Sequence, residues 1–302
     1  MNAIATCVGH DIAIDFGKKF IPEELTPLFY VPLYRSLTPD QCLRYNQLQA
    51  LYLNEQIIFF ETVVGRGVMA ALLRESWPNG FGDELQQFWD EERRHSEMFR
   101  QLNRRCASRL YGSGDFYFVQ TPRHWMTALN WATRHPRIFL VFIWLMLLQE
   151  ERSLFYSKEF IRQGKAIEPH FAETHRLHLA DEVGHVRWDE QLLDLLWPVA
   201  NRHLRRFNAR LLAWMVGEFF SVPKRGQWHV VQELAREFPA LQEHMPEMRR
   251  QLFALPTNGL YQLSLYSRQI TPRSFDRFDQ WPEFRVMQRA IPAYRLLPKE
   301  AR

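Results

Sequence analysis

Residues 91–95 read Glu-Glu-Arg-Arg-His, and residues 181–185 read Asp-Glu-Val-Gly-His. In each stretch a Glu precedes a His by three positions, and of the eleven histidines in the chain only His95 and His185 have a Glu at that spacing. Residues three apart lie on the same face of an α-helix, so each Glu-x-x-His pair can hold one metal ion from one side. The two stretches therefore predict two metal-binding helices.

A single carboxylate stands at the same distance before each pair. Glu61 and Glu151 each precede the Glu of a pair by 31 residues (92 − 61 and 182 − 151). One lone Glu and one Glu-x-x-His from each half is the ligand set of di-iron and di-manganese sites built inside four-helix bundles. The neighbouring candidates Glu55 and Glu150 do not keep this interval. We therefore predict Glu61 and Glu151 as the two lone carboxylate ligands.

Turn-forming residues lie near the middle of each interval. Residues 76–82 read Ser-Trp-Pro-Asn-Gly-Phe-Gly, and the second turn candidate runs from Gly164 to Pro169. Gly, Pro and Asn in such clusters end helices and form turns. A hairpin that closes at each cluster brings the lone Glu to the height of its Glu-x-x-His pair, so the sequence predicts two antiparallel helical hairpins.

The composition fits one helical domain that spans residues 1–302. The chain is 46% hydrophobic and 14% aromatic, and no Pro-, Gly- or Ser-rich linker divides it. We expect an all-α fold, a four-helix bundle with additional C-terminal helices. An irregular arm (1–37) should precede the metal-binding core (about 38–196), and accessory helices should follow (about 197–302). The core helices are expected at about 38–75, 83–110, 137–163 and 169–196. Prolines should break the accessory helices at Pro223, Pro239, Pro256 and Pro272.

Charge and cysteine usage indicate a cytoplasmic protein without a nucleic-acid or membrane partner. Its three cysteines show no Cys-x-x-Cys spacing, and we see no signal-peptide pattern. The longest apolar run, residues 138–148, falls short of the roughly 20 residues that span a bilayer. The net charge is +4, and the densest basic cluster, residues 202–210, is typical of the solvated side of a helix rather than of a phosphate-binding stripe.

A third histidine narrows the class of protein. His178 lies four residues before Glu182 and seven before His185, so it shares their helix face. With this His-x-x-x-Glu-x-x-His pattern, residues 55–190 resemble the AurF-like family of arylamine N-oxygenases (para-aminobenzoate N-oxygenase type), non-haem di-iron enzymes of the ferritin-like superfamily. The resemblance implies a ferritin-like bundle and seven iron ligands: Glu61, Glu92, His95, Glu151, His178, Glu182 and His185.

The resemblance also implies an activity. Two iron ions (Fe2+/Fe3+) would use O2 as co-substrate and electrons from an external donor, a reductase or a ferredoxin, to oxidise an amine to hydroxylamine, nitroso or nitro products. Other classes stay open. The first is a C-hydroxylase or desaturase, because residues 91–95 also resemble a motif of bacterial multicomponent hydroxylases. The others are a ferritin-like ferroxidase, a radical-generating subunit similar to that of ribonucleotide reductase, for which Tyr156 is the nearest tyrosine in sequence, and a helical scaffold with a coincidental motif. A homodimer is the candidate assembly. His175 is a rival for the third imidazole, and Asp181 and Asp189 are candidate acceptors for the N–H of a ligand imidazole.

Overall fold

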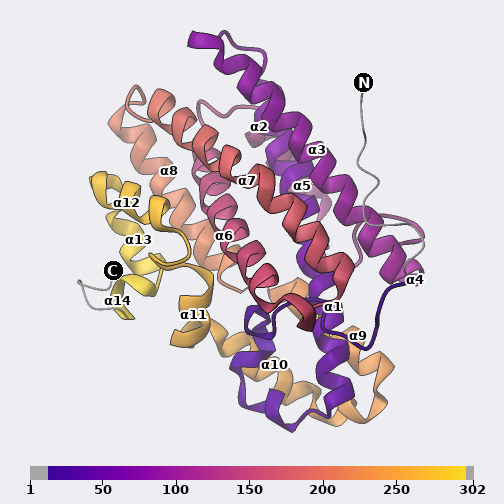
Figure 1. The fold of residues 1–302 in the computed structure, drawn as a ribbon. Coiled ribbons are helices and arrows are strands. Elements are labelled where there is room, and N and C mark those ends of the chain that lie inside the picture. Colours follow the sequence, from indigo (N-terminus) through magenta and orange to yellow (C-terminus); the bar gives the residue numbers. More distant parts are fainter. Residues whose placement is uncertain (1–12, 223, 297–302) are drawn as a thin grey trace.

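Helices account for nearly all of the chain that the structure describes, residues 13–222 and 224–296 of a computed structural model (Figure 1). Within these ranges the backbone forms no β-strand, and extended pairing is limited to a bridge between Lys19 and Ile167. The all-α prediction is confirmed. The expected break at Pro223 and the first twelve residues of the expected arm lie outside the described residues.

Four long helical segments build the bundle. They are α1 (Pro39–Phe59), which continues through a π-helical turn (Phe60–Gly65) into α2 (Arg66–Leu72), then α3 (Phe81–Cys106), α6 (Val141–Gln163) and α7 (Pro169–Leu196). The α6 and α7 helices form one antiparallel hairpin, and α3 packs between α1 and α7. The bounds of α7 match the predicted ones, whereas α6 begins four residues later than expected (141 − 137).

Local signals in the sequence fix the ends of these helices. The Thr38 side chain accepts a hydrogen bond from the Gln41 backbone N–H, and the Gln41 side chain accepts one from the Thr38 N–H, which makes a capping box at the start of α1. Asn79 and Gly80 adopt left-handed φ angles of 55° and 76° in the first turn, and Gly164 has a φ of 49° in the second. Both predicted turns are confirmed. Asn and Gly occupy these positions because both residue types tolerate a positive φ.

The π-helical turn interrupts the first long helix at the position of a predicted ligand. Glu61 is the second residue of the turn Phe60–Gly65. A π-helical turn hydrogen-bonds i to i+5 instead of i to i+4, so it takes up an extra residue and rotates the side chains that follow. Such bulges occur frequently at functional sites. The sequence pattern predicted a continuous helix here and did not reveal the bulge.

Helix α5 (Arg123–Thr133) lies between the second and third predicted core helices, where no helix was predicted. It packs against α2 and the π-helical turn. The contact is close at Gly67, where an added Cβ would lie 2.1 Å from Oγ1 of Thr133. A second correction concerns the predicted helix 83–110, which ends at Cys106 and is followed by the short α4 (Ser108–Tyr111). No side-chain cap marks either end of α5, so the sequence lacks the local signal that would have predicted this helix.

The remaining segments cover the bundle. The arm forms three short 3-10 helices, η1 (Glu23–Leu25), η2 (Pro27–Tyr30) and η3 (Pro32–Ser36). The C-terminal part contains α8 (Arg202–Met215), a second π-helical turn (Val216–Phe220), α9 (Lys224–Glu237), α10 (Met245–Ala254), α11 (Gly259–Leu265), α12 (Pro272–Gln280), α13 (Met287–Ala290) and α14 (Ala293–Leu296). Of these, α8 and α12 pack on α6. Over the described ranges, every helix is too short or too polar to cross a membrane.

Candidate metal centre

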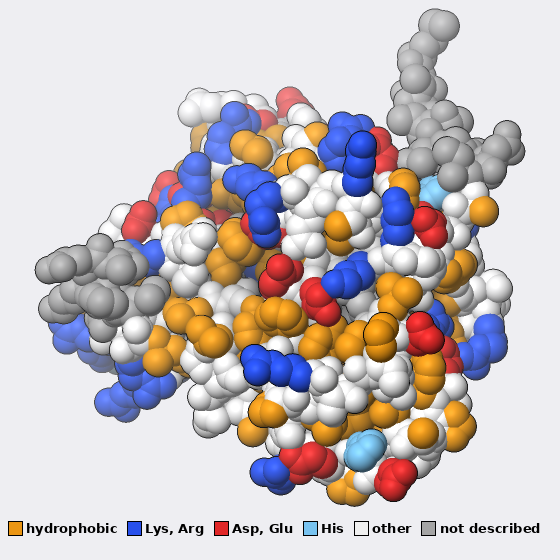
Figure 2. Space-filling view, turned by 60° about the horizontal axis from the view of Figure 1, so that its bottom comes forward, with side chains coloured by type: hydrophobic (Ala, Val, Ile, Leu, Met, Phe, Trp, Pro, Cys, Tyr) orange, Lys and Arg blue, Asp and Glu red, His pale blue; other side chains and the backbone are white. Residues whose placement is uncertain are grey.

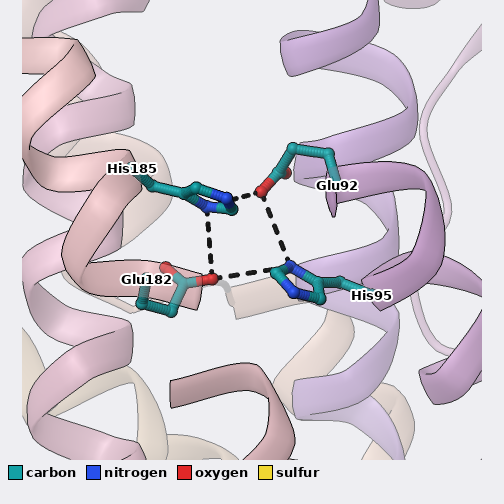
Figure 3. Close-up of side chains that lie close together, drawn as sticks. All are labelled: Glu92, His95, Glu182 and His185. Atoms are coloured by element: carbon teal, nitrogen blue, oxygen red, sulfur yellow. Dashed lines mark ion pairs between the residues drawn. The ribbon is translucent and has the colours of Figure 1, made fainter. Parts of the chain in front are cut away.

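Four side chains from α3 and α7 face one another inside the bundle (Figure 3). His185 Nδ1 lies 3.0 Å from Glu92 Oε1 and 3.5 Å from Glu182 Oε1. His95 Nδ1 lies 3.7 Å and 3.6 Å from the same two oxygens. All four side chains are buried. The two Glu-x-x-His pairs predicted from the sequence therefore meet and surround a common point.

A second group of possible ligands adjoins the first. It consists of Glu61, His95 and His178, so His95 belongs to both groups. His178 Nε2 lies 2.8 Å from Glu182 Oε1 and 3.6 Å from Glu61 Oε1. Ser96 Oγ donates a 2.5 Å hydrogen bond to Glu61 Oε2 and orients that carboxylate. Two adjoining groups of potential ligands are the arrangement that a dinuclear centre requires.

The structure places Glu150, and not Glu151, in the cluster. Glu150 Oε2 lies 3.9 Å from His185 Nδ1, and burial together with the neighbouring Glu182 raises the pKa of Glu150 well above its usual range. Glu151 lies elsewhere: its two carboxylate oxygens accept hydrogen bonds of 2.7 and 2.8 Å from the backbone N–H groups of Arg273 and Ser274. These residues begin α12, where free N–H groups and the helix dipole favour a carboxylate. The carboxylate of Glu150, rather than that of Glu151, therefore lies beside the two Glu-x-x-His pairs.

Two outer carboxylates orient the imidazoles. Asp181 Oδ2 lies 3.0 Å from His95 Nε2, and Glu91 Oε2 lies 3.1 Å from His185 Nε2. Each of these residues directly precedes the Glu of one pair and reaches the His of the other pair. Carboxylate partners of this kind fix the tautomer and leave the second ring nitrogen free for a metal ion, here Nδ1. Asp181 was a predicted acceptor, whereas Glu91 was missed although it precedes Glu92 as Asp181 precedes Glu182.

The inward-facing atoms of the cluster are buried without hydrogen-bond partners among the described residues. They are Glu92 Oε1, His95 Nδ1, both carboxylate oxygens of Glu182, and His185 Nδ1. Glu92 Oε1 faces His185 Nδ1 at 3.0 Å and Glu182 Oε1 faces His178 Nε2 at 2.8 Å, but neither contact is a hydrogen bond. Burying carboxylate oxygens without hydrogen bonds is costly, so these atoms fit a cation. Carboxylate oxygen and imidazole nitrogen together suit Fe(II) or Mn(II).

The charges of the cluster also fit a cation. Burial and the nearby Glu92 raise the pKa of Glu61 to about 7. Burial alone would lower the pKa of His178, but Glu182 and Glu61 raise it to about 10. Protons on the imidazoles thus balance the buried carboxylates, and a metal ion would replace those protons, as metal binding to imidazole and carboxylate generally does.

Two alternative candidates for metal ligands, His175 and Glu55, take structural roles instead. The His175 ring stacks on Phe160 with 3.6 Å between ring centroids, and its Nδ1 lies 3.5 Å from Ser157 Oγ. Glu55 accepts hydrogen bonds from the backbone N–H groups of residues 117–119 and so holds the connection that leads to α5. Asp189 is buried beside the cluster, and its carboxylate has no hydrogen-bond partner in the described part of the chain, so it does not serve as the predicted imidazole acceptor.

A cavity lies between α1 and α6. Arg152 lines it together with amide and phenol side chains, which are Gln49, Gln56, Gln227, Tyr156 and Tyr261. The cavity volume is about 30 Å³, room for one or two water molecules. The Arg152 guanidinium lies over the rings of Tyr156 and Tyr266, and none of the carboxylates that the structure describes pairs with it. The carbonyl oxygens of Gln49 and Gln227 are buried without partners in the same described part.

A helical bundle that buries two adjoining groups of Glu and His side chains defines a class of proteins able to hold a dinuclear metal centre between four helices. The family model described as P-aminobenzoate N-oxygenase AurF matches residues 9–254, and the chain belongs to this family, which has a ferritin-like fold. No curated protein sequence matches the chain. The family match ends before α12, the helix that binds Glu151.

Proposed function

We propose that the protein is an O2-dependent non-haem di-iron monooxygenase that oxidises the nitrogen of an amine. The observation that carries the proposal is the pair of buried ligand groups that share His95. Bound iron would supply electrons to O2. The reaction balances as R–NH2 + O2 + 2 e− + 2 H+ → R–NHOH + H2O, so two electrons must come from an external donor. Further oxidation would give nitroso or nitro products.

The proposed ligands are four carboxylates and three imidazoles. They are Glu61, Glu92, His95, Glu150, His178, Glu182 and His185. Asp181 and Glu91 would hold the rings of His95 and His185 in the orientation that points Nδ1 at the metals. Membership of the family supports a di-iron site, and Glu150 replaces the predicted Glu151 because its carboxylate lies 3.9 Å from His185 Nδ1.

The proposed substrate is an arylamine that carries a carboxylate, as the family name suggests. Arg152 supports this choice, because it donates a 3.0 Å hydrogen bond to the Tyr266 hydroxyl but pairs with no carboxylate that the structure describes, and a guanidinium binds a carboxylate through two parallel hydrogen bonds.

The decisive experiment combines metal analysis with product analysis. Anaerobic loading with Fe(II) should give two irons per chain. The reduced protein, exposed to O2 with 4-aminobenzoate, should add oxygen to nitrogen, as read by mass spectrometry, and 4-aminobenzamide should react more slowly because it lacks the carboxylate. A stoichiometry of one or zero irons, or oxygen added only to carbon, would refute the proposal. Arg152→Lys should raise KM for the acid more than for the amide.

A variant at His178 separates an N-oxygenase from a generic iron-binding bundle. His178→Ala should fold and retain part of its iron through the other six ligands, but it should yield little oxygenated amine. His175→Ala is the matched control, because His175 lies on the same helix outside the cluster. Equal product from the His178 variant and from wild type would show that His178 is only a buried core histidine.

A further inference from the structure

An exposed aromatic surface lies on the outside of α5, α8 and the π-helical turn Val216–Phe220 that follows α8; we refer to it as the α5–α8 surface. Its large side chains are between 42% and 56% exposed and comprise Trp125, Trp131, Phe207, Trp214 and Phe219. Trp125 contacts both Trp214 and Phe219 with ring centroids 6.4 Å apart, so α5 and α8 join in one continuous patch. Exposed tryptophans that cluster in this way mark a binding surface more often than a solvated face.

The same surface carries more basic than acidic side chains. Residues 116–149 and 195–217 contain no Asp or Glu, and Glu218, beside Phe219, is an exposed carboxylate at its edge. Five exposed arginines lie on or next to α5 and α8, namely Arg123, Arg134, Arg202, Arg206 and Arg210. Within the described ranges none of the five forms an ion pair, whereas most other arginines do. By contrast, Figure 2 shows that the end of the bundle near α10 mixes acidic and basic side chains.

The α5–α8 surface is one helix away from the candidate metal centre. Helix α5 packs directly on the π-helical turn that carries Glu61. Helix α5 also approaches α2 closely, because a Cβ at Gly67 would lie 2.1 Å from Thr133 Oγ1. A helix with its side chains is about 10 Å thick. A protein docked on α5 would therefore approach the metal centre more closely than one docked at the end of the bundle near α10.

We propose that the α5–α8 surface docks an acidic electron-carrying protein that delivers the two electrons of the reaction, one at a time. This inference rests on the proposed function, because amine oxidation by O2 needs an external reductant. The arginines supply the complementary charge that steers an acidic partner, and the tryptophans supply the buried anchors of the interface. Both residue types are enriched at protein interfaces.

Two other occupants are disfavoured. A second copy of the chain in a twofold interface would bring the same unpaired arginines face to face, which repels. An anionic membrane would attract the arginines as well, but the surface is formed by two packed helices that both belong to the folded core rather than by a separate amphipathic anchor. Binding to an anionic membrane is therefore tested with phosphatidylserine vesicles.

The test measures direct binding to the metal-free full chain, so it does not depend on iron or turnover. The probe is a plant-type [2Fe–2S] ferredoxin with an acidic surface, titrated by calorimetry at about 20 and 200 mM salt. Affinity should fall at least about tenfold at the higher salt, because the contacts are electrostatic. Arg206→Glu with Arg210→Glu should weaken binding at least about tenfold, and Trp125→Ala with Trp214→Ala should do so without a change of charge.

The control is Arg35→Glu with Arg176→Glu, which changes the net charge equally but lies away from the α5–α8 surface. This variant should retain ferredoxin affinity within about twofold. Equal weakening by the control, no ferredoxin binding at low salt, or binding to phosphatidylserine vesicles in place of ferredoxin would overturn the proposal. Iron stoichiometry and turnover driven by dithionite report on the proposed function separately, since neither requires docking.

Discussion

The two hairpins of the bundle carry the same ligand pattern but position the lone carboxylate by different means. In the first hairpin Glu61 lies on a π-helical turn that α5 covers. In the second hairpin Glu150 lies on the regular α6, and its neighbour Glu151 binds the start of α12. The two Glu-x-x-His pairs, by contrast, mirror each other down to the reciprocal hydrogen bonds of Asp181 and Glu91.

The difference shows which spacings are reliable. A Glu and a His three residues apart on one helix share a face whatever surrounds them. The interval between two helices also depends on the turn and on the regularity of each helix. One residue corresponds to 100° of rotation on an α-helix, since there are 3.6 residues per turn. If the predicted interval between two ligands is wrong by one residue, it selects a side chain on another face of the helix. Glu151 is such a residue, because its carboxylate binds the start of α12.

The largest expected effect separates Glu150 from Glu151. Glu150→Ala should weaken binding of at least one iron by more than about 100-fold, because it removes a carboxylate that faces His185 and Glu182. Glu151→Ala should keep both irons. Equilibrium dialysis with Fe(II) under anaerobic conditions measures both variants. Loss of iron from the Glu151 variant alone would show that Glu151 is the ligand, as the equal 31-residue intervals predict, and that both hairpins position their lone carboxylate in the same way.

The mirrored hydrogen bonds of the two halves give the next effect. Glu91→Ala and Asp181→Ala should each weaken metal binding by about 10–100-fold, because the imidazole loses the acceptor that fixes its orientation. The two losses should be similar, since each carboxylate serves the His of the other pair. Metal titration of each variant tests this, with Asp90→Ala on the exposed side of α3 as the control. A large effect of one substitution and none of the other would show that the pairs are not equivalent.

Most of the fold and most of the cluster could be predicted from local signals. Three local features were predictable because each depends on residues only a few positions apart. They are the capping box at Thr38, the turns formed by glycines and the Glu-x-x-His spacing. The fold class and family were confirmed, whereas the ligand roles stay predictions. The features that were missed depend on distant contacts. The N–H groups that bind Glu151 come from residues 273 and 274, about 120 residues later in the chain.

The start of α12 supplies a test of stability that should leave the metal alone. Glu151→Ala should lower the free energy of unfolding by about 1–3 kcal/mol, because two helix N-terminal N–H groups lose a charged acceptor. Thermal unfolding with and without iron measures it. The control Glu173→Ala removes an exposed carboxylate of α7 and should cost less than about 1 kcal/mol. Similar losses in both variants would mean that Glu151 does not hold α12 in place.

The smallest effect concerns the cover of the first hairpin. Replacing Gly67 by Ala adds a Cβ 2.1 Å from Thr133 Oγ1 and 2.6 Å from Thr133 Cβ, so α5 must shift. Overpacking of this kind costs about 1–3 kcal/mol, and the higher helix propensity of Ala returns up to about 1 kcal/mol. Gly67→Ala should therefore lower the free energy of unfolding by about 0.5–2 kcal/mol in urea titrations. Gly82→Ala is the control, because its Cβ would meet nothing within 4 Å, and it should stabilise slightly. Adding Thr133→Gly should restore part of the loss by removing the contacted side chain. If Gly67→Ala were as stable as Gly82→Ala, α5 would not pack tightly against α2 at this contact. The packing of α5 over the first hairpin would then be less close than the packing of α8 and α12 on α6.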